Sequence, residues 1–352
     1  MSFQDAWAAL HMEMPPQIPR TEYSADFHWP LIEKVTGLTV SESSPEEVRR
    51  EATKRFMKAW DYGFVWNAML YATELEACRT IMGHASYRAD GSDFNANINC
   101  PFEDVEDVLE FDPLAVYPAY SHGELVKRFN ENYKAKCAFF PDAVNTTGTY
   151  ITLVSGMLEI FGWDMFLMGL GMDAKAMGEV ANKYARWIQP YFNALADCDA
   201  PIINIHDDIT WTSGAFVHPD WYRTYVFPNY KKYFAPILEA GKKIVFTSDG
   251  NFTQFVDDIA DAGANGFILE PTTDMAYIAE KYGKTHAFIG NVDTRILLSG
   301  TKEDIYNEVK RCVDIGKNCP GFFLAVGNHI PANTPVENAL YYNEVFEKLR
   351  KR

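Results

Sequence analysis

Acidic, amide and imidazole side chains follow short apolar segments at five places in the second half of the chain. The segments read I-I-N-I-H-D-D, K-I-V-F-T-S-D-G-N, G-F-I-L-E-P, A-F-I-G-N-V-D and F-F-L-A-V-G-N-H. The polar residues in question are His206, Asp207, Asp208, Asp249, Asn251, Glu270, Asn291, Asp293, Asn328 and His329. If the segments are parallel strands, their carboxyl ends meet at one edge, so we expect these side chains to share a site.

Two kinds of chemistry suit such a site. Asp, Glu and His side chains that converge can bind a divalent cation such as zinc through oxygen and imidazole ligands. Alternatively, carboxylates that crowd one another raise each other's proton affinity, and one of them then becomes a general acid at neutral pH. The spacing of the residues does not choose between a metal site and an acid.

Each of these residues also has an ordinary structural explanation. Asp and Asn are common helix N-caps and turn residues, so Asp249 and Asn251 fit a turn and Asp293 fits an N-cap. His329 fits either a ligand or proton carrier, or a hydrogen-bonded structural residue. Repetition after five successive segments favours one shared site over five separate caps.

The elements that carry these residues alternate regularly. Strands are predicted near 149–154 and at 202–206, 243–247, 266–269, 286–290 and 321–326. Amphipathic helices are predicted at 219–240, 252–263, 273–282, 301–316 and from about Pro335. Such alternation indicates a parallel sheet that is buried on both faces.

An open doubly wound sheet and a closed (β/α)₈ barrel both fit this alternation. We predict the barrel because its usual length range includes 352 residues, polar clusters follow every strand of the second half, and no glycine-rich dinucleotide fingerprint opens a helix. Residues 1–352 are predicted to form a single domain, with 1–60 as a mainly helical N-terminal extension. A helix is predicted from Ser44 to Trp60, and a loop over 87–101.

Composition restricts the partners and the compartment. The formal net charge of −16 disfavours nucleic acid and anionic membranes as partners. The chain shows neither a run of about 18 apolar residues nor a signal peptide, so we expect a cytoplasmic protein. Six cysteines are scattered without a C-x-x-C pair, which indicates neither a disulfide framework nor a thiolate zinc ribbon.

Several stretches together resemble the uroporphyrinogen decarboxylase superfamily over about residues 200–350. They are S-D-G-N, A-G-A-N-G-F-I-L-E-P, F-I-G-N-V-D-T-R-I-L-L-S-G-T-K-E-D-I and G-N-H-I-P-A-N-T-P-V-E-N-A. The resemblance implies a (β/α)₈ barrel. It also implies one of two activities: decarboxylation of acetate groups on a porphyrinogen, or methyl transfer to or from a corrinoid carried by a partner protein.

The resemblance favours the methyltransferase branch. Decarboxylases of the superfamily carry a Met-Arg-Gln-Ala-Gly-Arg type motif whose arginines bind substrate carboxylates, whereas this chain has only I-P-R-T-E-Y around Arg20. The methyltransferases typically hold zinc through a His-x-Cys-Gly motif and a later Cys. Here Thr247 stands for that His, Asp249 for the first Cys and Asn328 for the last Cys, so the thiolate zinc site is lost as such.

The stretches S-D-G-N and G-N-H-I-P are similar to proteins of corrinoid-dependent demethylation in anaerobes. We therefore expect a methyltransferase that moves a methyl group from a small substrate, such as a methoxylated aromatic compound, to a corrinoid-binding partner protein. A homodimer is a candidate assembly. The alternatives are a porphyrinogen decarboxylase and a non-catalytic tetrapyrrole- or corrinoid-binding barrel.

On this hypothesis the residues divide into two groups. Candidate catalytic residues are Asp249, Glu270, His329 and Asp208, of which the first three are also candidate ligands for zinc. Candidate substrate- or cofactor-binding residues are His206, Asp207, Asn251, Asn291, Asp293 and Asn328. A Lewis-acid metal or a proton donor at the leaving oxygen would help an alkoxide or phenoxide to depart.

Overall fold

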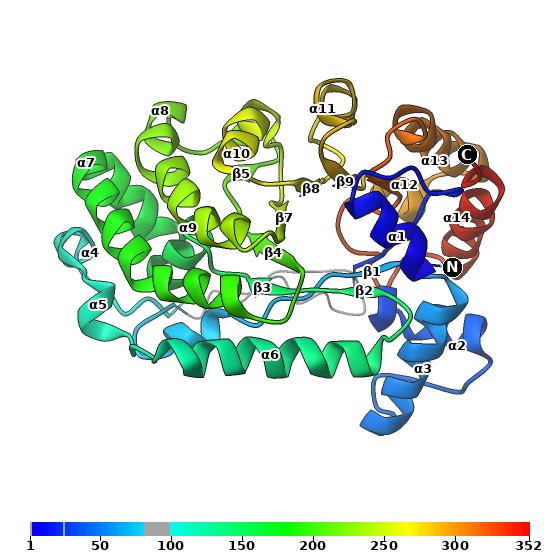
Figure 1. Cartoon of the computed structure of the whole chain (residues 1–352), viewed down its shortest axis with the longest axis horizontal. Coiled ribbons are helices and arrows are strands. Elements are labelled where there is room, and N and C mark those ends of the chain that lie inside the picture. Colours follow the sequence, from blue (N-terminus) through cyan, green and yellow to red (C-terminus); the bar gives the residue numbers. More distant parts are fainter. Residues whose placement is uncertain (1, 24, 81–98) are drawn as a thin grey trace.

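The computed structural model describes residues 2–23, 25–80 and 99–352, and helices surround a central group of strands (Figure 1). Most of the loop predicted over 87–101 lies outside the described residues. None of the helices in the described part of the chain is long and apolar enough to cross a membrane.

Six parallel strands form most of the barrel wall. They are β3 (Thr147–Thr149), β4 (Ile202–His206), β7 (Lys243–Thr247), β8 (Gly266–Ile268), β9 (Ala287–Ile289) and β10 (Phe322–Phe323), paired in this order. In this register His206 lies beside Thr247, and Thr247 beside Ile268. The strands therefore end at the same level, and the residues that follow them meet at one rim.

Short pairings close the sheet into a ring. Strand β1 (Phe64–Val65) pairs with β2 (Val144–Asn145), which leads directly into β3. Arg20 forms parallel bridges with both Tyr62 and Leu324. The segment around Arg20 is thus the first barrel strand, lying between β1 and β10, and the predicted (β/α)₈ barrel is confirmed.

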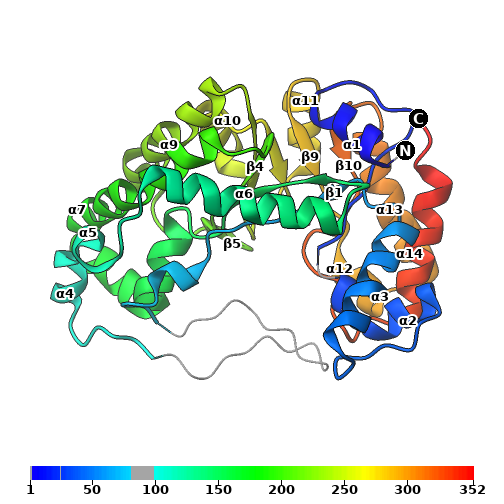
Figure 2. The ribbon, with the colours of Figure 1, turned by 60° about the horizontal axis from the view of Figure 1, so that its bottom comes forward.

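The N-terminal region is helical, as expected, but it is not only an extension. Along the chain, helix α1 (Ser2–Leu10) precedes the segment that contains Arg20, and helices α2 (Trp29–Thr36) and α3 (Glu46–Ala59) follow it. That segment is part of the barrel wall because the Arg20 carbonyl accepts a hydrogen bond from Gly63 N at 2.9 Å. Both marked chain ends lie on the same side of the molecule in the two views (Figures 1 and 2).

Helices outside the barrel follow the predicted alternation with local differences. They are α4 (Val105–Glu110), α5 (Pro113–Val116), α6 (His122–Phe139), α7 (Val154–Asp197), α8 (Pro219–Trp221), α9 (Phe227–Glu239), α10 (Val256–Ala262), α11 (Met275–Tyr282), α12 (Thr294–Ser299), α13 (Lys302–Gly316) and α14 (Val336–Leu349). The predicted helix 219–240 contains a π-helical stretch, Tyr222–Val226. The long α7 is broken at Gly162 and Asp173, whose backbone angles are not helical.

Alternate residues of the strands face two different cores. One core contains Phe64, Ile202, Val245 and Phe323, together with apolar residues of α1. These side chains fill the barrel interior, and α1 packs at its amino-terminal end because it contacts β1, β2 and β10. The carboxyl ends of the strands are left to carry polar residues, as active sites of this architecture do.

Candidate active site

Three carboxylates lie together at the carboxyl ends of neighbouring strands. Asp208 follows β4, Asp249 follows β7 and Glu270 follows β8. Oδ1 of Asp208 accepts a hydrogen bond from Asp249 N at 2.9 Å, and Oε2 of Glu270 accepts one from Gly250 N at 2.8 Å. The structure thus brings together three of the four candidate catalytic residues.

Asp249 is the member of this group that retains a proton most readily. The residue is exposed to solvent, although many protein atoms surround its carboxyl group. This desolvation and the negative charges of Asp208 and Glu270 raise the pKa of Asp249 to about 8, against the opposing charge of His206. At neutral pH Asp249 is therefore mostly a neutral carboxylic acid.

His206 is buried beside these carboxylates. Its Nε2 lies 3.2 Å from Oδ1 of Asp208, and its Nδ1 lies 3.0 Å from the carbonyl oxygen of Tyr150. Burial by itself lowers the pKa of His206, but the charge and hydrogen bond of Asp208 and the charge of Asp249 raise it to about 9. Since both ring nitrogens face oxygen atoms, the imidazolium form satisfies both contacts.

Asn328 connects the end of β10 to the carboxylates. Its Nδ2 donates to Oε1 of Glu270 at 2.5 Å. It also hydrogen-bonds to the Asp249 carboxylate, which counteracts part of the rise in the pKa of Asp249. Asn328 therefore helps to hold Glu270 and Asp249 side by side.

Asp207 faces away from this group although it precedes Asp208 in the chain. Its carboxylate is fully buried and accepts hydrogen bonds from the backbone N–H groups of Leu153, Val154 and Ser155 at 3.1, 3.0 and 2.6 Å. The Tyr230 hydroxyl donates a further bond. Asp207 thus satisfies N–H groups at the start of α7 that have no acceptor within the helix, and it anchors that helix to the barrel.

Asn251 and Asn291 hold loops in place. Oδ1 of Asn251 accepts a hydrogen bond from Thr253 N at 3.1 Å, which forms the turn that the sequence also allowed. Nδ2 of Asn291 donates to the carbonyl oxygens of Glu270 and Thr273, at 3.1 Å each. Both amides are engaged by backbone, so they position the loops that carry the carboxylates.

Asp293 is the N-cap of a helix, which is the structural role that the sequence also allowed for it. Its Oδ1 accepts a hydrogen bond from Arg295 N at 2.9 Å at the start of α12, and its Oδ2 lies 2.6 Å from Nη2 of Arg295. Burial alone would raise the pKa of Asp293, but the bonds and charge of Arg295 lower it. Asp293 is thus an ionised, paired residue.

The proposed zinc ligands are not assembled. Among the residues that the structure describes, no three His, Cys, Asp or Glu side chains are grouped so that they could hold a metal ion. Asp249 and Glu270 are neighbours, but His329 lies on the wall of an adjacent cavity, where burial lowers its pKa to about 4. Asp249, Glu270 and His329 are therefore not arranged as a set of zinc ligands. Zinc binding stays a prediction that metal analysis can test.

Glu159 is a neighbour of the site that the strand-end pattern did not reveal. It lies in α7 and is buried, which raises its pKa to about 7 in spite of Arg79, whose Nη1 is 3.5 Å from Oε2. The charge of His206 also acts on it. A single acidic residue in the apolar run V-S-G-M-L-E-I-F-G is the sequence signal that marks it.

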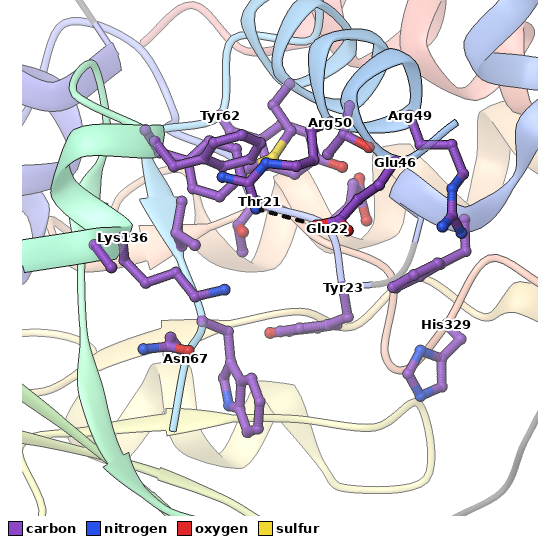
Figure 3. A pocket seen from close by; sticks show the side chains of 18 of the residues that line it. Thr21, Glu22, Tyr23, Glu46, Arg49, Arg50, Tyr62, Asn67, Lys136 and His329 are labelled. Carbon is purple, nitrogen blue, oxygen red and sulfur yellow. Dashed lines mark ion pairs between the residues drawn. The ribbon is translucent and has the colours of Figure 1, made fainter. Parts of the chain in front are cut away.

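A cavity of about 710 Å³ opens between the ends of the first strands, α3 and α6. Figure 3 shows Tyr23 and His329 in this space, with Arg49 and Arg50 of α3 on one side and Asn67 opposite. Trp66 also lines it, and Nε1 of Trp66 donates to Oγ1 of Thr247 at 3.2 Å. The cavity therefore extends from the ends of the first strands towards the end of β7.

Comparison with known families identifies the chain. The family model described as uroporphyrinogen decarboxylase matches residues 98–349. The chain belongs to the uroporphyrinogen decarboxylase family. This confirms the resemblance that the motifs of the second half indicated, and the match extends it towards the N-terminus.

Uroporphyrinogen decarboxylases from bacteria are distant relatives. The chain is 27% identical over 161 residues to a uroporphyrinogen decarboxylase of Pelobacter propionicus, covering 46% of each protein. It is 28% identical over 189 residues to that of Chromohalobacter salexigens, covering 51% of this chain and 50% of the relative. The chain thus spans about half the length of these curated relatives.

A solved structure of similar fold covers nearly the whole chain. It is a methyltransferase from Methanosarcina mazei, which matches with a TM-score of 0.64 and 18% sequence identity over 99% of this chain and 98% of its own. At this identity the likeness supports the barrel fold alone.

Proposed function

We propose that the chain is a corrinoid-dependent methyltransferase that breaks a methyl–oxygen bond while it protonates the leaving oxygen. The observation that carries this proposal is the position of Asp249 beside Asp208 and Glu270, where desolvation and then these two charges raise the pKa of Asp249 to about 8. A carboxylic acid of this kind is suited to general acid catalysis near neutral pH.

A reduced corrinoid on a partner protein would supply the nucleophile that accepts the methyl group. Asp249 would donate its proton to the ether oxygen as the bond between the methyl carbon and that oxygen breaks. The oxygen then leaves as a neutral alcohol or phenol, and Asp249 becomes a carboxylate. The His206 imidazolium next to Asp208 offsets this new negative charge, and solvent at the exposed Asp249 returns the proton.

The surroundings of Arg20 argue against the decarboxylase alternative. A porphyrinogen with many carboxylates needs cations that are free to bind them. Arg20 is fully buried, its Nη2 lies 2.8 Å from Oε1 of Glu22, and its guanidinium lies 4.5 Å from the centre of the Trp60 ring. Arg20 is thus committed to the barrel wall and does not reach a substrate.

The proposal is tested by incubating the protein with reduced cobalamin and a panel of methyl ethers, and by following the absorbance spectrum of the corrinoid. We expect methylation with at least one donor, dependent on the protein. A parallel incubation with uroporphyrinogen measures decarboxylation. Turnover of uroporphyrinogen without any methyl transfer would establish the decarboxylase alternative, and neither reaction would favour a non-catalytic barrel.

A further inference from the structure

The cavity contains a cation, Arg49, that has no counter-ion among the described residues. Arg49 and Arg50 both extend from α3 to its wall (Figure 3). Arg50 pairs with Glu46 at 4.0 Å and lies 4.5 Å from the centre of the Phe139 ring. By contrast, the Arg49 side chain forms no ion pair with any residue that the structure describes, and its Nε is buried without a hydrogen-bond partner there.

The acidic groups nearest to the cavity do not compensate Arg49. Glu22 also lines the cavity, but its Oε1 is held by Arg20 and the Tyr342 hydroxyl and its Oε2 by Val326 N. A guanidinium that is partly withdrawn from water costs free energy unless an anion pairs with it. A carboxylate matches the two parallel donors of an arginine, as a phosphate does.

The rest of the wall suits a planar ring. Tyr23, Trp66 and Tyr71 all line the cavity, and Tyr71 and Trp66 each pack against the ring of Tyr150. The Tyr23 hydroxyl is buried and has no hydrogen-bond partner within the described residues, so it is ready to bond a polar ligand atom. A volume of about 710 Å³ falls within the usual range for small-molecule sites.

Two residues of the cavity wall, Tyr23 and Trp66, lie near the proposed acid. The charge of Asp249 contributes, after burial and the charge of Glu22, to raising the pKa of Tyr23 well above its usual value. Trp66 bonds to Thr247, two positions before Asp249. A ligand that extends from Arg49 past Tyr23 and Trp66 therefore directs its far end towards Asp249.

We propose that this cavity binds a small aromatic molecule with one carboxylate group, and that Arg49 holds the carboxylate. The ring lies against Tyr23 and Trp66, and the end opposite the carboxylate approaches Asp249. In a chain with a net charge of −16, an anionic ligand needs such a local cation. That this ligand is the methyl donor rests on the proposed function, whereas its binding does not.

Binding of two probes that differ in one charge tests the proposal. We would titrate the full chain at neutral pH with 4-methoxybenzoate and with its neutral analogue 4-methoxybenzamide, using calorimetry and the fluorescence of Trp66 and Trp29, which line the cavity. The benzoate should bind about tenfold more tightly than the benzamide, because the charge-assisted bond to Arg49 is available to it alone.

Variants of α3 separate the role of Arg49 from a general effect of charge. Arg49→Gln should weaken binding of the benzoate about tenfold and leave binding of the benzamide within about twofold. Arg55→Gln is the matched control, since Arg55 is exposed on the same helix and pairs with Glu51 at 2.7 Å. Arg55→Gln should change neither the affinity for the benzoate nor the affinity for the benzamide. Circular dichroism verifies that both variants are folded. If Arg49→Gln does not fold, Arg49→Lys takes its place, and it should keep only part of the affinity of the unmodified chain for the benzoate.

Three results would overturn the proposal: equal affinity for benzoate and benzamide, unchanged affinity in Arg49→Gln, or tighter binding of acetate than of 4-methoxybenzoate. The experiment contains no corrinoid, so it is independent of methyl transfer. Benzoate binding without any methyl transfer would leave the cavity assignment in place and count against the proposed function. Methyl transfer from an aliphatic ether, with no binding of aromatic ligands, would support the proposed function and count against the cavity assignment.

Discussion

The two halves of the barrel mouth carry different side chains. The ends of β4, β7 and β8 carry carboxylates and an imidazole, joined by hydrogen bonds of 2.8 to 3.2 Å. The ends of the first strand and β1 carry the aromatic residues Tyr23 and Trp66, and α3 adds cations beside them. The half at β4, β7 and β8 is therefore acidic and can donate a proton, while the half at the first strand, β1 and α3 is aromatic and positively charged.

This difference indicates a division of tasks. A proton donor needs crowded carboxylates, which repel an anionic ligand, so the anion of a ligand has to be held elsewhere. The aromatic and cationic half provides such a place at the same rim. Substitutions in each half test whether the halves are separate in this way.

The largest effect is expected from removing the proposed acid. Asp249→Asn keeps the shape of the side chain and loses the proton donor, so methyl transfer should fall by about 10²- to 10⁴-fold. A donor with an acidic leaving group should lose much less, because its oxygen departs without a proton. Initial rates of corrinoid methylation measure both, with Asp314→Asn, an exposed residue bonded to Lys310, as the control.

The adjacent aspartates should have opposite effects on stability and activity. Asp207→Ala leaves three buried N–H groups at the start of α7 without an acceptor, so the free energy of unfolding should fall by about 3 kcal/mol or more. Asp208→Ala should cost less than about 1 kcal/mol and reduce methyl transfer instead. Urea denaturation measures the stabilities, and equal losses would show that Asp208 is also a structural anchor.

The pH dependence should follow the charges around Asp249. With a pKa of about 8, Asp249 is protonated below that pH, so the rate should fall as the pH rises through about 8. Glu270→Gln removes one repelling charge and lowers the pKa of Asp249, which should move this decline to lower pH by up to about one unit. An unmoved pH–rate profile would assign the decline to another group.

The smallest effect is expected in the aromatic half. Tyr23→Phe removes a buried hydroxyl that has no partner within the described residues, so the free energy of unfolding should change by less than about 1 kcal/mol. The same variant should weaken binding of 4-methoxybenzoate if the hydroxyl bonds the ligand. Thermal melts and calorimetry measure the two quantities. A marked loss of stability would mean that the hydroxyl is engaged in the protein itself.

The second half of the fold could be predicted from the sequence because its strands are continuous apolar runs. The bounds of β4 and β7 agree with the predicted ranges 202–206 and 243–247. The first half was less visible, since β1 and β2 are two residues long. The first strand also contains Arg20, whose buried pairing with Glu22 cannot be inferred from local composition.

The site was predictable to the same extent. Polar residues after apolar strands indicated Asp208, Asp249 and Glu270, and the structure places them together. Whether Asp207 or Asp208 faces the mouth depends on the direction of each side chain, which spacing alone does not determine. The aromatic wall was not predicted, because rings such as Trp66 fit a packed core equally well until their neighbours are known.

The position of the first barrel strand between β1 and β10 affects how the barrel folds during synthesis. Arg20 pairs with Leu324, and Val326 N bonds to Glu22 although the two residues are 304 positions apart. During synthesis, the segment around Arg20 can pair with β1 early, but its other edge has no neighbour until residues near 324 have left the ribosome. The nascent barrel therefore keeps two unpaired strand edges for most of its synthesis, and those edges are where we expect chaperones to bind it.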